Sequence, residues 1–218
     1  MSPAARRLVV FDWDGTLVDS LRGITATARA VLLEFGFAEE ELGDLTRLVG
    51  PPFPQAYSQV YGLSDADAAE VTRRYRSRYE AGTVDDWPIF EGIRDLLARL
   101  RLNGRLLAIA SSKRHGLVMR QVGDNGIAGA FDAICGKTSD GDDTKEEAIL
   151  RAISQMDGTV DDAVMVGDRD IDVHAAAAVG VPCVGVLYGK TAPRSELVDA
   201  GAVAIAETVA ELEALLLS

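Results

Sequence analysis

Short runs of apolar residues alternate with longer amphipathic stretches over most of the chain. The runs contain almost no polar position, which is typical of parallel strands that are buried on both faces. We expect strands at Leu8–Phe11, Leu106–Ala110, Ala133–Cys135, Ala163–Val166, Cys183–Val186 and Val203–Ile205.

Helical patterns separate these strands. They fall at Glu91–Leu102, Gly116–Asn125, Lys145–Met156, Ile171–Val179, Pro193–Ala200 and Val209–Leu217. Strands that alternate with helices favour an α/β fold with a doubly wound parallel sheet, which is the Rossmann-like arrangement.

The stretch from residue 18 to residue 88 interrupts this alternation. It has no convincing strand and instead predicts helices at Leu21–Phe35, Glu39–Leu48, Phe53–Tyr61 and Asp65–Ala81. So long a helical stretch after the first strand cannot be an ordinary crossover. We therefore predict a core of residues 1–17 and 89–218, and an inserted α-helical cap domain of residues 18–88 above the C-terminal edge of the sheet.

Composition and charge restrict the possible partners. The 218 residues carry a net charge of −12, so nucleic acid is not expected as a partner, because binding its phosphate backbone needs a positive surface. No apolar run approaches the ~20 residues of a membrane helix, and no membrane partner is expected. Cys135 and Cys183 lie in apolar runs and are predicted to be small buried residues. We expect a cytoplasmic protein that is a monomer or a homodimer.

The first strand ends in two carboxylates, Asp12 and Asp14, followed by Gly15. The C-terminal edge of an open α/β sheet is where ligands bind. Gly15 allows a turn that other residues resist, and Trp13 is expected to pack into the core or beneath the cap. This arrangement suits a nucleophilic carboxylate that is assisted by a metal ion.

Other polar residues follow later strands. Ser111-Ser112-Lys113 come after the second strand, Lys145 opens a helix after the loop 139–144, and Gly167–Asp172 come after the fourth strand. Taken alone, Ser111 is equally well a helix N-cap, Lys145 a solvated lysine and the aspartates turn residues. Taken together they lie where parallel strands end, and we expect them to converge.

On these residues the chain resembles the haloacid dehalogenase superfamily of phosphohydrolases. Asp12-Trp13-Asp14-Gly15-Thr16 is similar to its first motif, Ser111 to the second, Lys145 to the third and Gly167–Asp172 to the fourth. Residues 49–53, Ser112-Lys113 and residues 185–189 resemble its phosphoglycolate phosphatase-like branch, which has a helical cap between the first two motifs.

The resemblance implies a role for each site residue. Asp12 would be the nucleophile that forms an aspartyl-phosphate, and Asp14 the general acid and base. Mg²⁺ would be held by the Asp12 carboxylate, the Asp14 backbone carbonyl and Asp168, with Asp172 orienting Lys145 or the water around the metal. The residues expected to bind phosphate are Gly15, Thr16, Ser111, Ser112, Lys113 and Lys145.

The cap would exclude water and recognise the leaving group, with the loop 50–53, Arg47, Lys113 and Arg114 as candidates. The function implied is a Mg²⁺-dependent phosphatase that acts on a small phosphorylated metabolite, phosphoglycolate-like by resemblance. A nucleotidase, a pyrophosphatase, and a phosphosugar phosphatase or mutase remain alternatives in the same superfamily.

Two enzymatic alternatives and one non-enzymatic alternative are less consistent with the residues. Asp14 argues against a haloacid dehalogenase, and the absence of lysine between Val18 and Pro88 argues against a phosphonate-cleaving enzyme that uses a cap lysine. The non-enzymatic alternative is a phosphate-accepting regulatory or binding protein. Receiver-like domains of that class are shorter and place the phosphorylated aspartate on a middle strand.

Overall fold

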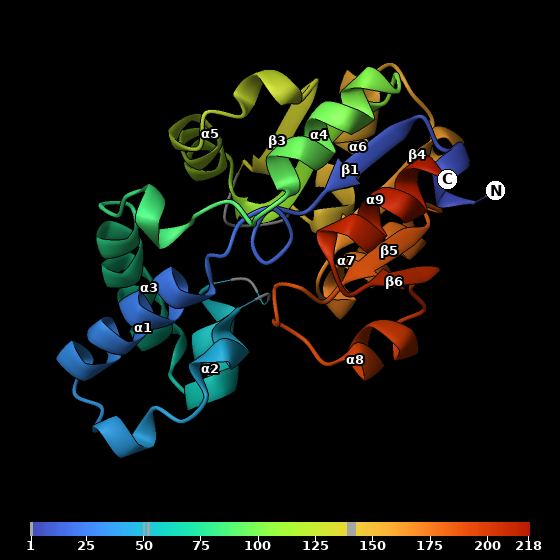
Figure 1. Cartoon of the computed structure of the whole chain (residues 1–218). Coiled ribbons are helices and arrows are strands. Elements are labelled where there is room, and N and C mark those ends of the chain that lie inside the picture. Colours follow the sequence, from blue (N-terminus) through green and yellow to red (C-terminus); the bar gives the residue numbers. More distant parts are fainter. Residues whose placement is uncertain (1, 50, 52, 139–142) are drawn as a thin grey trace. The chain divides into compact units, whose positions relative to one another are not determined.

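The computed structural model describes residues 2–49, 51, 53–138 and 143–218. The chain forms two compact units. Unit 1 contains Met1–Asp19 and Pro88–Ser218, and unit 2 contains Ser20–Trp87. Helices and strands of both units are labelled in Figure 1.

Unit 1 contains a parallel sheet of six strands in the order β3-β2-β1-β4-β5-β6. Every residue of the central strands β1 and β4 is buried, which explains their uninterrupted apolar sequences. The strands are β1 (Leu8–Phe11), β2 (Leu106–Arg114), β3 (Ala133–Lys137), β4 (Ala163–Gly167), β5 (Cys183–Val186) and β6 (Ala204–Ala206).

Helices cover both faces of this sheet, as predicted (Figure 1). Two of the pairs in contact are α6 with α7 and α4 with α9. The helices are α4 (Ile93–Leu102), α5 (His115–Asp124), α6 (Lys145–Gln155), α7 (Asp170–Ala178), α8 (Arg194–Asp199) and α9 (Val209–Leu217), with short 3-10 turns η1 (Pro3–Ala5), η5 (Ala128–Ala130) and η6 (Val160–Asp162). The expected doubly wound α/β fold is confirmed.

The second strand is longer than predicted. Strand β2 continues past Ala110 through Ser111, Ser112 and Lys113 to Arg114, with a shift of register against β3 in this part. Ser111 is therefore a strand residue, and the interpretation of this serine as a helix N-cap is wrong, since α5 begins only at His115. The extension has no apolar pattern, because Ser111 is a buried polar residue, Ser112 and Lys113 are only partly buried, and Arg114 is exposed.

Unit 2 is helical and has no strand among its described residues. Its elements are α1 (Leu21–Phe35), η2 (Glu39–Glu41), η3 (Leu45–Leu48), α2 (Gln55–Tyr61), α3 (Asp65–Tyr79) and η4 (Val84–Asp86). Helix α1 contacts α3, and α2 also packs on α3.

The helix expected at Glu39–Leu48 is wrong. This segment forms two separate 3-10 turns, η2 and η3. Gly43 lies between them with a left-handed φ of 55°, and the Asp44 side chain accepts a hydrogen bond from the Thr46 N–H and so begins the second turn. A glycine in this conformation ends a helix, and an aspartate at this place starts a new one.

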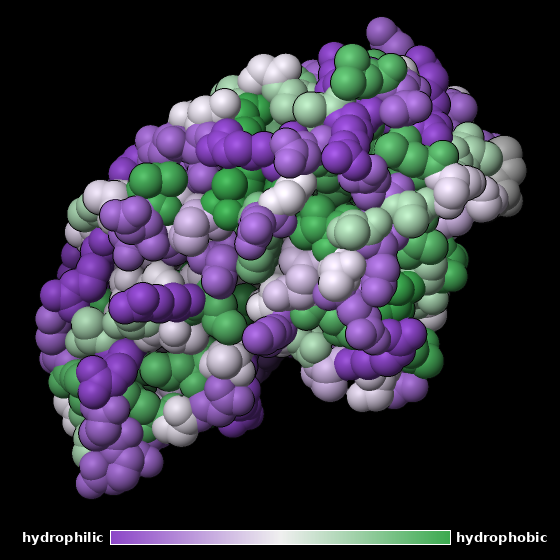
Figure 2. All heavy atoms as spheres, in the orientation of Figure 1, coloured by the Kyte–Doolittle hydropathy of each residue, from purple (hydrophilic) through white to green (hydrophobic). Residues whose placement is uncertain are grey.

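In the part of the chain that the structure describes, no helix is both long and apolar enough to cross a membrane. On the face in view in Figure 2, hydrophobic residues are interspersed with hydrophilic ones.

Candidate active site

Asp12 lies directly beyond the buried strand β1, and its backbone N–H donates to the Val166 carbonyl of β4 at 2.8 Å. The two strands are parallel neighbours in register, with Phe11 opposite Val166. Asp168 follows the end of β4. The pairing of the two strands therefore brings Asp12 and Asp168 to the same edge of the sheet, although they are far apart in sequence.

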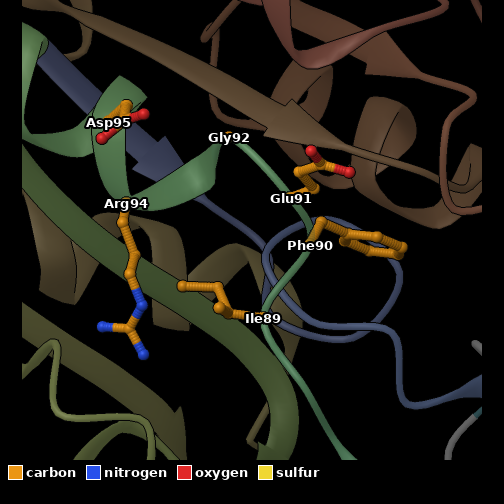
Figure 3. Close-up of a pocket in the computed structure, with 6 residues that line it drawn as sticks. All are labelled: Ile89, Phe90, Glu91, Gly92, Arg94 and Asp95. Atoms are coloured by element: carbon orange, nitrogen blue, oxygen red, sulfur yellow. The ribbon is translucent and has the colours of Figure 1, made fainter.

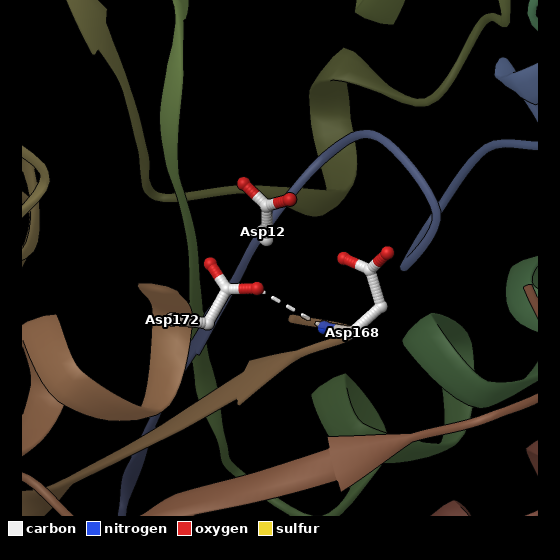
Figure 4. Close-up of side chains that lie close together, drawn as sticks. All are labelled: Asp12, Asp168 and Asp172. Carbon is white, nitrogen blue, oxygen red and sulfur yellow. Dashed lines mark hydrogen bonds between the residues drawn. The ribbon is translucent and has the colours of Figure 1, made fainter. Parts of the chain in front are cut away.

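Three carboxylates gather at this edge, those of Asp12, Asp168 and Asp172 (Figure 4). Each offers an oxygen atom that lies within 4.8 Å of the others. All three residues are buried, with 7%, 1% and 1% of their surface exposed. Burial of so much negative charge is costly unless positive charge compensates it.

Lys145 supplies one positive charge. It is the first residue of α6, whose N-terminus is capped by the Thr144 side chain. Its Nζ lies 2.5 Å from Oδ1 of Asp12 and 2.5 Å from Oδ1 of Asp172. Lys145 is itself buried, so the ammonium group bridges two carboxylates in an environment with little water.

The pKa shifts show that one lysine does not balance the cluster. Burial raises the pKa of Asp12 to about 7, although Lys145 acts in the opposite direction. Burial, followed by repulsion from Asp172 and Asp12, raises the pKa of Asp168 well above its usual range. Burial also disfavours the ammonium form of Lys145, but attraction to Asp12 and Asp172 outweighs it and raises the pKa of Lys145.

This surplus of buried negative charge fits a divalent cation. The donors are hard carboxylate oxygens, which are the ligands that Mg²⁺ and Ca²⁺ prefer. Asp12 and Asp168, two of the residues predicted to hold metal, belong to the cluster. Asp14 was expected to contribute its backbone carbonyl, and its carboxylate is not in the cluster.

Asp172 holds the turn that carries Asp168. Its Oδ2 accepts hydrogen bonds from the backbone N–H groups of Asp168 and Arg169, both at 3.1 Å, and the bond to Asp168 is drawn in Figure 4. Since its other oxygen contacts Lys145, Asp172 ties Lys145 to the loop after β4. A side chain at Gly167 would overlap Asp172, so this close approach requires glycine.

The Asp168 carboxylate contacts two hydroxyl groups. Thr16 Oγ1 donates to its Oδ1 at 3.3 Å, and Thr191 Oγ1 donates to its Oδ2. Tyr188 Oη donates to the Thr16 carbonyl at 2.8 Å. The loop after β5 therefore supports the loop after β1. Sequence reasoning missed Thr191, because a threonine in an irregular loop carries no periodic signal.

Gly15 adopts a left-handed φ of 76°, and a Cβ atom there would overlap the Asp168 carboxylate and approach Thr191. Both the conformation and the lack of space exclude other residues. The sequence-based prediction that Gly15 permits an unusual turn is therefore confirmed.

Asp14 and Lys113 form an ion pair of 2.6 Å between Nζ and Oδ1. Lys113 Nζ also donates to Gln121 Oε1 at 3.0 Å, and the same oxygen accepts a 2.7 Å hydrogen bond from Trp13 Nε1. Trp13 is fully buried. Gln121 was missed by sequence reasoning, although a glutamine on the apolar side of a helix between Val118 and Val122 was a usable signal.

Ser111 is buried, and its Oγ accepts a hydrogen bond from the Lys113 N–H at 3.2 Å. Ser112 follows it on β2 and is partly buried. Because β2 pairs with β1, both serines lie on the strand next to the one that Asp12 follows.

The remaining candidates are Arg47, Arg114 and the loop 50–53. Arg47 belongs to unit 2, and Arg114 is exposed at the end of β2. Gly50 and Pro52 of the predicted loop, and residues 139–142 before Lys145, lie outside the described residues.

A pocket of about 310 Å³ opens in unit 1 at the start of α4 (Figure 3). Its Arg94 donates to the Asn125 carbonyl at 2.6 Å, and Glu91 and Asp95 are exposed. Its lining contains no predicted site residue; it consists of Ile89, Phe90, Glu91, Gly92, Arg94 and Asp95.

Comparison with known proteins places this site in context. The sequence model of a family described as "Haloacid dehalogenase-like hydrolase" matches residues 9–186. A 5'-nucleotidase of Pseudomonas aeruginosa is 35% identical over 83% of this chain and 82% of its own length. A crystal structure of a predicted phosphatase from Clostridium acetobutylicum has a TM-score of 0.89 at 35% identity, covering 96% of this chain and 97% of that one.

Two further relatives carry different names. A phosphoglycolate phosphatase of Rhodospirillum rubrum is 30% identical over 94% of this chain and 89% of its own length. The tyrosine-protein kinase PtkA of Mycobacterium tuberculosis is 38% identical over 88% of this chain, which spans 65% of that protein. The activities for which these relatives are named differ.

Proposed function

Because the chain belongs to the haloacid dehalogenase-like hydrolases, we propose that it is a phosphatase that hydrolyses a small phosphomonoester with Mg²⁺ through an aspartyl-phosphate on Asp12. The observation that carries the proposal is the buried contact of Lys145 with Asp12 beside Asp168 and Asp172. This arrangement combines a nucleophile, a fixed positive charge and a set of oxygen donors for a cation.

In the proposed reaction a carboxylate oxygen of Asp12 attacks phosphorus, and the bond between phosphorus and the leaving oxygen breaks. Asp14, in its acid form, gives its proton to the departing alkoxide. In the second half it takes a proton from water, whose oxygen attacks the aspartyl-phosphate and releases phosphate and free Asp12. Asp14 suits this role since it follows Asp12 by two residues but lies outside the cluster of Asp12, Asp168 and Asp172.

Asp12 and Asp168 are the carboxylates proposed to hold Mg²⁺, together with the backbone carbonyl of Asp14. The bound ion supplies charge neutralisation, which lets an anionic carboxylate approach an anionic phosphate. Thr16 and Thr191 keep the Asp168 carboxylate in place through their hydroxyl groups. Supporting contacts of this kind are a general requirement of metal sites.

Lys145 and Ser111 are proposed to bind the oxygens of the transferring phosphoryl group. Lys145 is held by Asp172 as well as by Asp12, so it stays in position as Asp12 reacts. A fixed donor of this kind stabilises charge that develops in the transition state without reorganisation. Gly15, Thr16, Ser112 and Lys113 complete the proposed phosphate site.

The substrate is proposed to be small, with unit 2 acting as a cap that excludes water and selects the leaving group. Phosphoglycolate and nucleoside monophosphates are the first candidates, since relatives are named for these activities. The relative named a tyrosine-protein kinase makes phosphoryl transfer to a tyrosine hydroxyl the second candidate.

The experiment is a screen of phosphorylated metabolites with Mg²⁺ that measures released phosphate as kcat/KM. Asp12→Asn is the inactive control and the exposed Glu91→Gln a matched acid-to-amide control. We expect one class of phosphomonoester to be hydrolysed, EDTA to stop turnover and Mg²⁺ to restore it. Turnover by Asp12→Asn, or turnover in EDTA, would overturn the proposal; phosphate transfer to a tyrosine peptide without release would favour the second candidate.

A further inference from the structure

Gln121 is a fully buried glutamine on the apolar side of α5, between Val118 and Val122. Burying an amide costs free energy unless its polar atoms find partners. Its Oε1 has two, but its Nε2 has no partner among the described residues. An apolar side chain would be cheaper here, so packing alone does not explain a glutamine.

The two donors to Oε1 fix the orientation of the amide. Trp13 Nε1 and Lys113 Nζ can only donate hydrogen bonds, so the atom facing them at 2.7 Å and 3.0 Å must be the oxygen. One oxygen atom therefore joins α5 to the loop after β1 and to the end of β2.

The same contacts lead to a proposed catalytic group. Lys113 Nζ lies 2.6 Å from Asp14 Oδ1, so the ammonium group lies between the amide oxygen and the carboxylate. Trp13 stands in the sequence between Asp12 and Asp14. Gln121 thus acts on this loop twice, directly through Trp13 and through Lys113 on Asp14.

We infer that Gln121 is a positioning residue that, with Trp13, holds Lys113 against Asp14 and so aims the Asp14 carboxyl group at the leaving oxygen. The inference rests on the proposed phosphatase function. It predicts that loss of the amide oxygen impairs proton delivery to a poor leaving group and leaves substrate binding and attack by Asp12 nearly intact.

The test compares two aryl esters that differ chiefly in the leaving group. The phenolate of phenyl phosphate needs protonation as it departs, whereas that of 4-nitrophenyl phosphate departs without it. Gln121→Met and Gln121→Leu remove the acceptor oxygen and replace the amide with an apolar side chain of similar size. Gln121→Glu keeps oxygen acceptors for Trp13 and Lys113. Val122→Ala, at the neighbouring buried position of α5, reports the effect of lost packing alone.

We expect Gln121→Met and Gln121→Leu to lower kcat on phenyl phosphate about tenfold or more, a part of the roughly 10²–10⁴-fold that general acid catalysis contributes. The effect on 4-nitrophenyl phosphate should be about threefold or less, with KM unchanged on both esters. Gln121→Glu should restore kcat on phenyl phosphate, and Val122→Ala should alter both esters equally.

An equal loss on both esters in the Gln121 variants, or no loss on either, overturns the inference and leaves the proposed function intact. Failure of both apolar variants to fold overturns it too, because it assigns this oxygen a role in catalysis and not in folding. If the unaltered protein releases phosphate from neither ester with Mg²⁺, the proposed function fails and the inference fails with it.

Discussion

Lys145→Met removes the ammonium group that bridges Asp12 and Asp172 and keeps an unbranched apolar side chain in its place. Breaking a buried ion pair by removing one partner costs about 3–5 kcal/mol of folding free energy, because the remaining charge is left buried without compensation. Lys145 is 6% exposed and lies 2.5 Å from each carboxylate, so solvent cannot replace it. We expect a loss of about 4 kcal/mol at pH 8.5.

The loss depends on pH. The folded pKa of Asp12 is about 7, above the ordinary value of 3.8, so folding takes up a proton between these values and stability falls as pH rises through that window. Without Lys145 the folded pKa of Asp12 rises further and the window extends upward. Lys145 is charged at both pH 5.5 and pH 8.5, since its stabilisation is complete below its ordinary pKa of 10.5. The difference between the two pH values therefore comes from Asp12, which holds its proton at pH 5.5 and is ionised at pH 8.5. The variant should lose less free energy of unfolding at pH 5.5 than at pH 8.5.

The assay is urea unfolding in EDTA, followed by fluorescence. The chain has two tryptophans, and in a Trp87→Phe background Trp13 alone reports on unit 1. With an m-value of about 2 kcal/mol per M, the expected loss lowers the midpoint by roughly 2 M. Exposed Lys190→Met is the control for removing one positive charge. Equal midpoints for Lys145→Met and Lys190→Met at pH 8.5 would show that the buried ammonium group does not stabilise unit 1.

Two further predictions concern the loops around Asp168. Gly15→Ala should cost about 1–2 kcal/mol for its left-handed conformation and also abolish most turnover through overlap with the Asp168 carboxylate. Gly104 has a similar φ of 75° with open space around its Cα, so Gly104→Ala should show the same loss of stability with a normal kcat. Equal kcat values for Gly15→Ala and Gly104→Ala would contradict this. Thr191→Val removes the hydroxyl group that donates to the Asp168 carboxylate. It should raise the Mg²⁺ concentration for half-maximal activity about 10-fold or more, while Thr191→Ser should not. An unchanged Mg²⁺ requirement in Thr191→Val would show that this contact does not support the metal.

Much of the fold could be predicted because strands buried on both faces leave an unmistakable apolar pattern, as in Leu8–Phe11 and Ala163–Val166. The convergence of Asp12 and Asp168 followed from the same pattern, since residues after parallel neighbouring strands meet at one edge. Lys145 alone could equally be a solvated lysine, and it became a candidate only together with the other polar residues and through the resemblance to the third family motif. The structure adds that it contacts both Asp12 and Asp172.

Other features depend on contacts that no local pattern records. The hydroxyl of Thr191 reaches Asp168 only because the loop after β5 folds back on the loop after β1, as the contact of Tyr188 with Thr16 shows. The segment Glu39–Leu48 has a helical composition, but Gly43 and Asp44 divide it into two turns. Gln121 has the spacing of a core residue, and although an amide at such a position is a signal, only the structure identifies its partners Trp13 and Lys113.

Asp12 is proposed to carry the phosphoryl group, and chemical trapping can detect that group on the protein. Asp14→Asn should slow hydrolysis of the intermediate, and 4-nitrophenyl phosphate needs no proton donor to form it. After an acid quench, borohydride reduction converts an aspartyl-phosphate to homoserine, which peptide mass spectrometry locates. We expect homoserine at position 12 in the presence of Mg²⁺ and none in EDTA. Homoserine at another aspartate, or unmodified Asp12 during continued release of 4-nitrophenol, would contradict it.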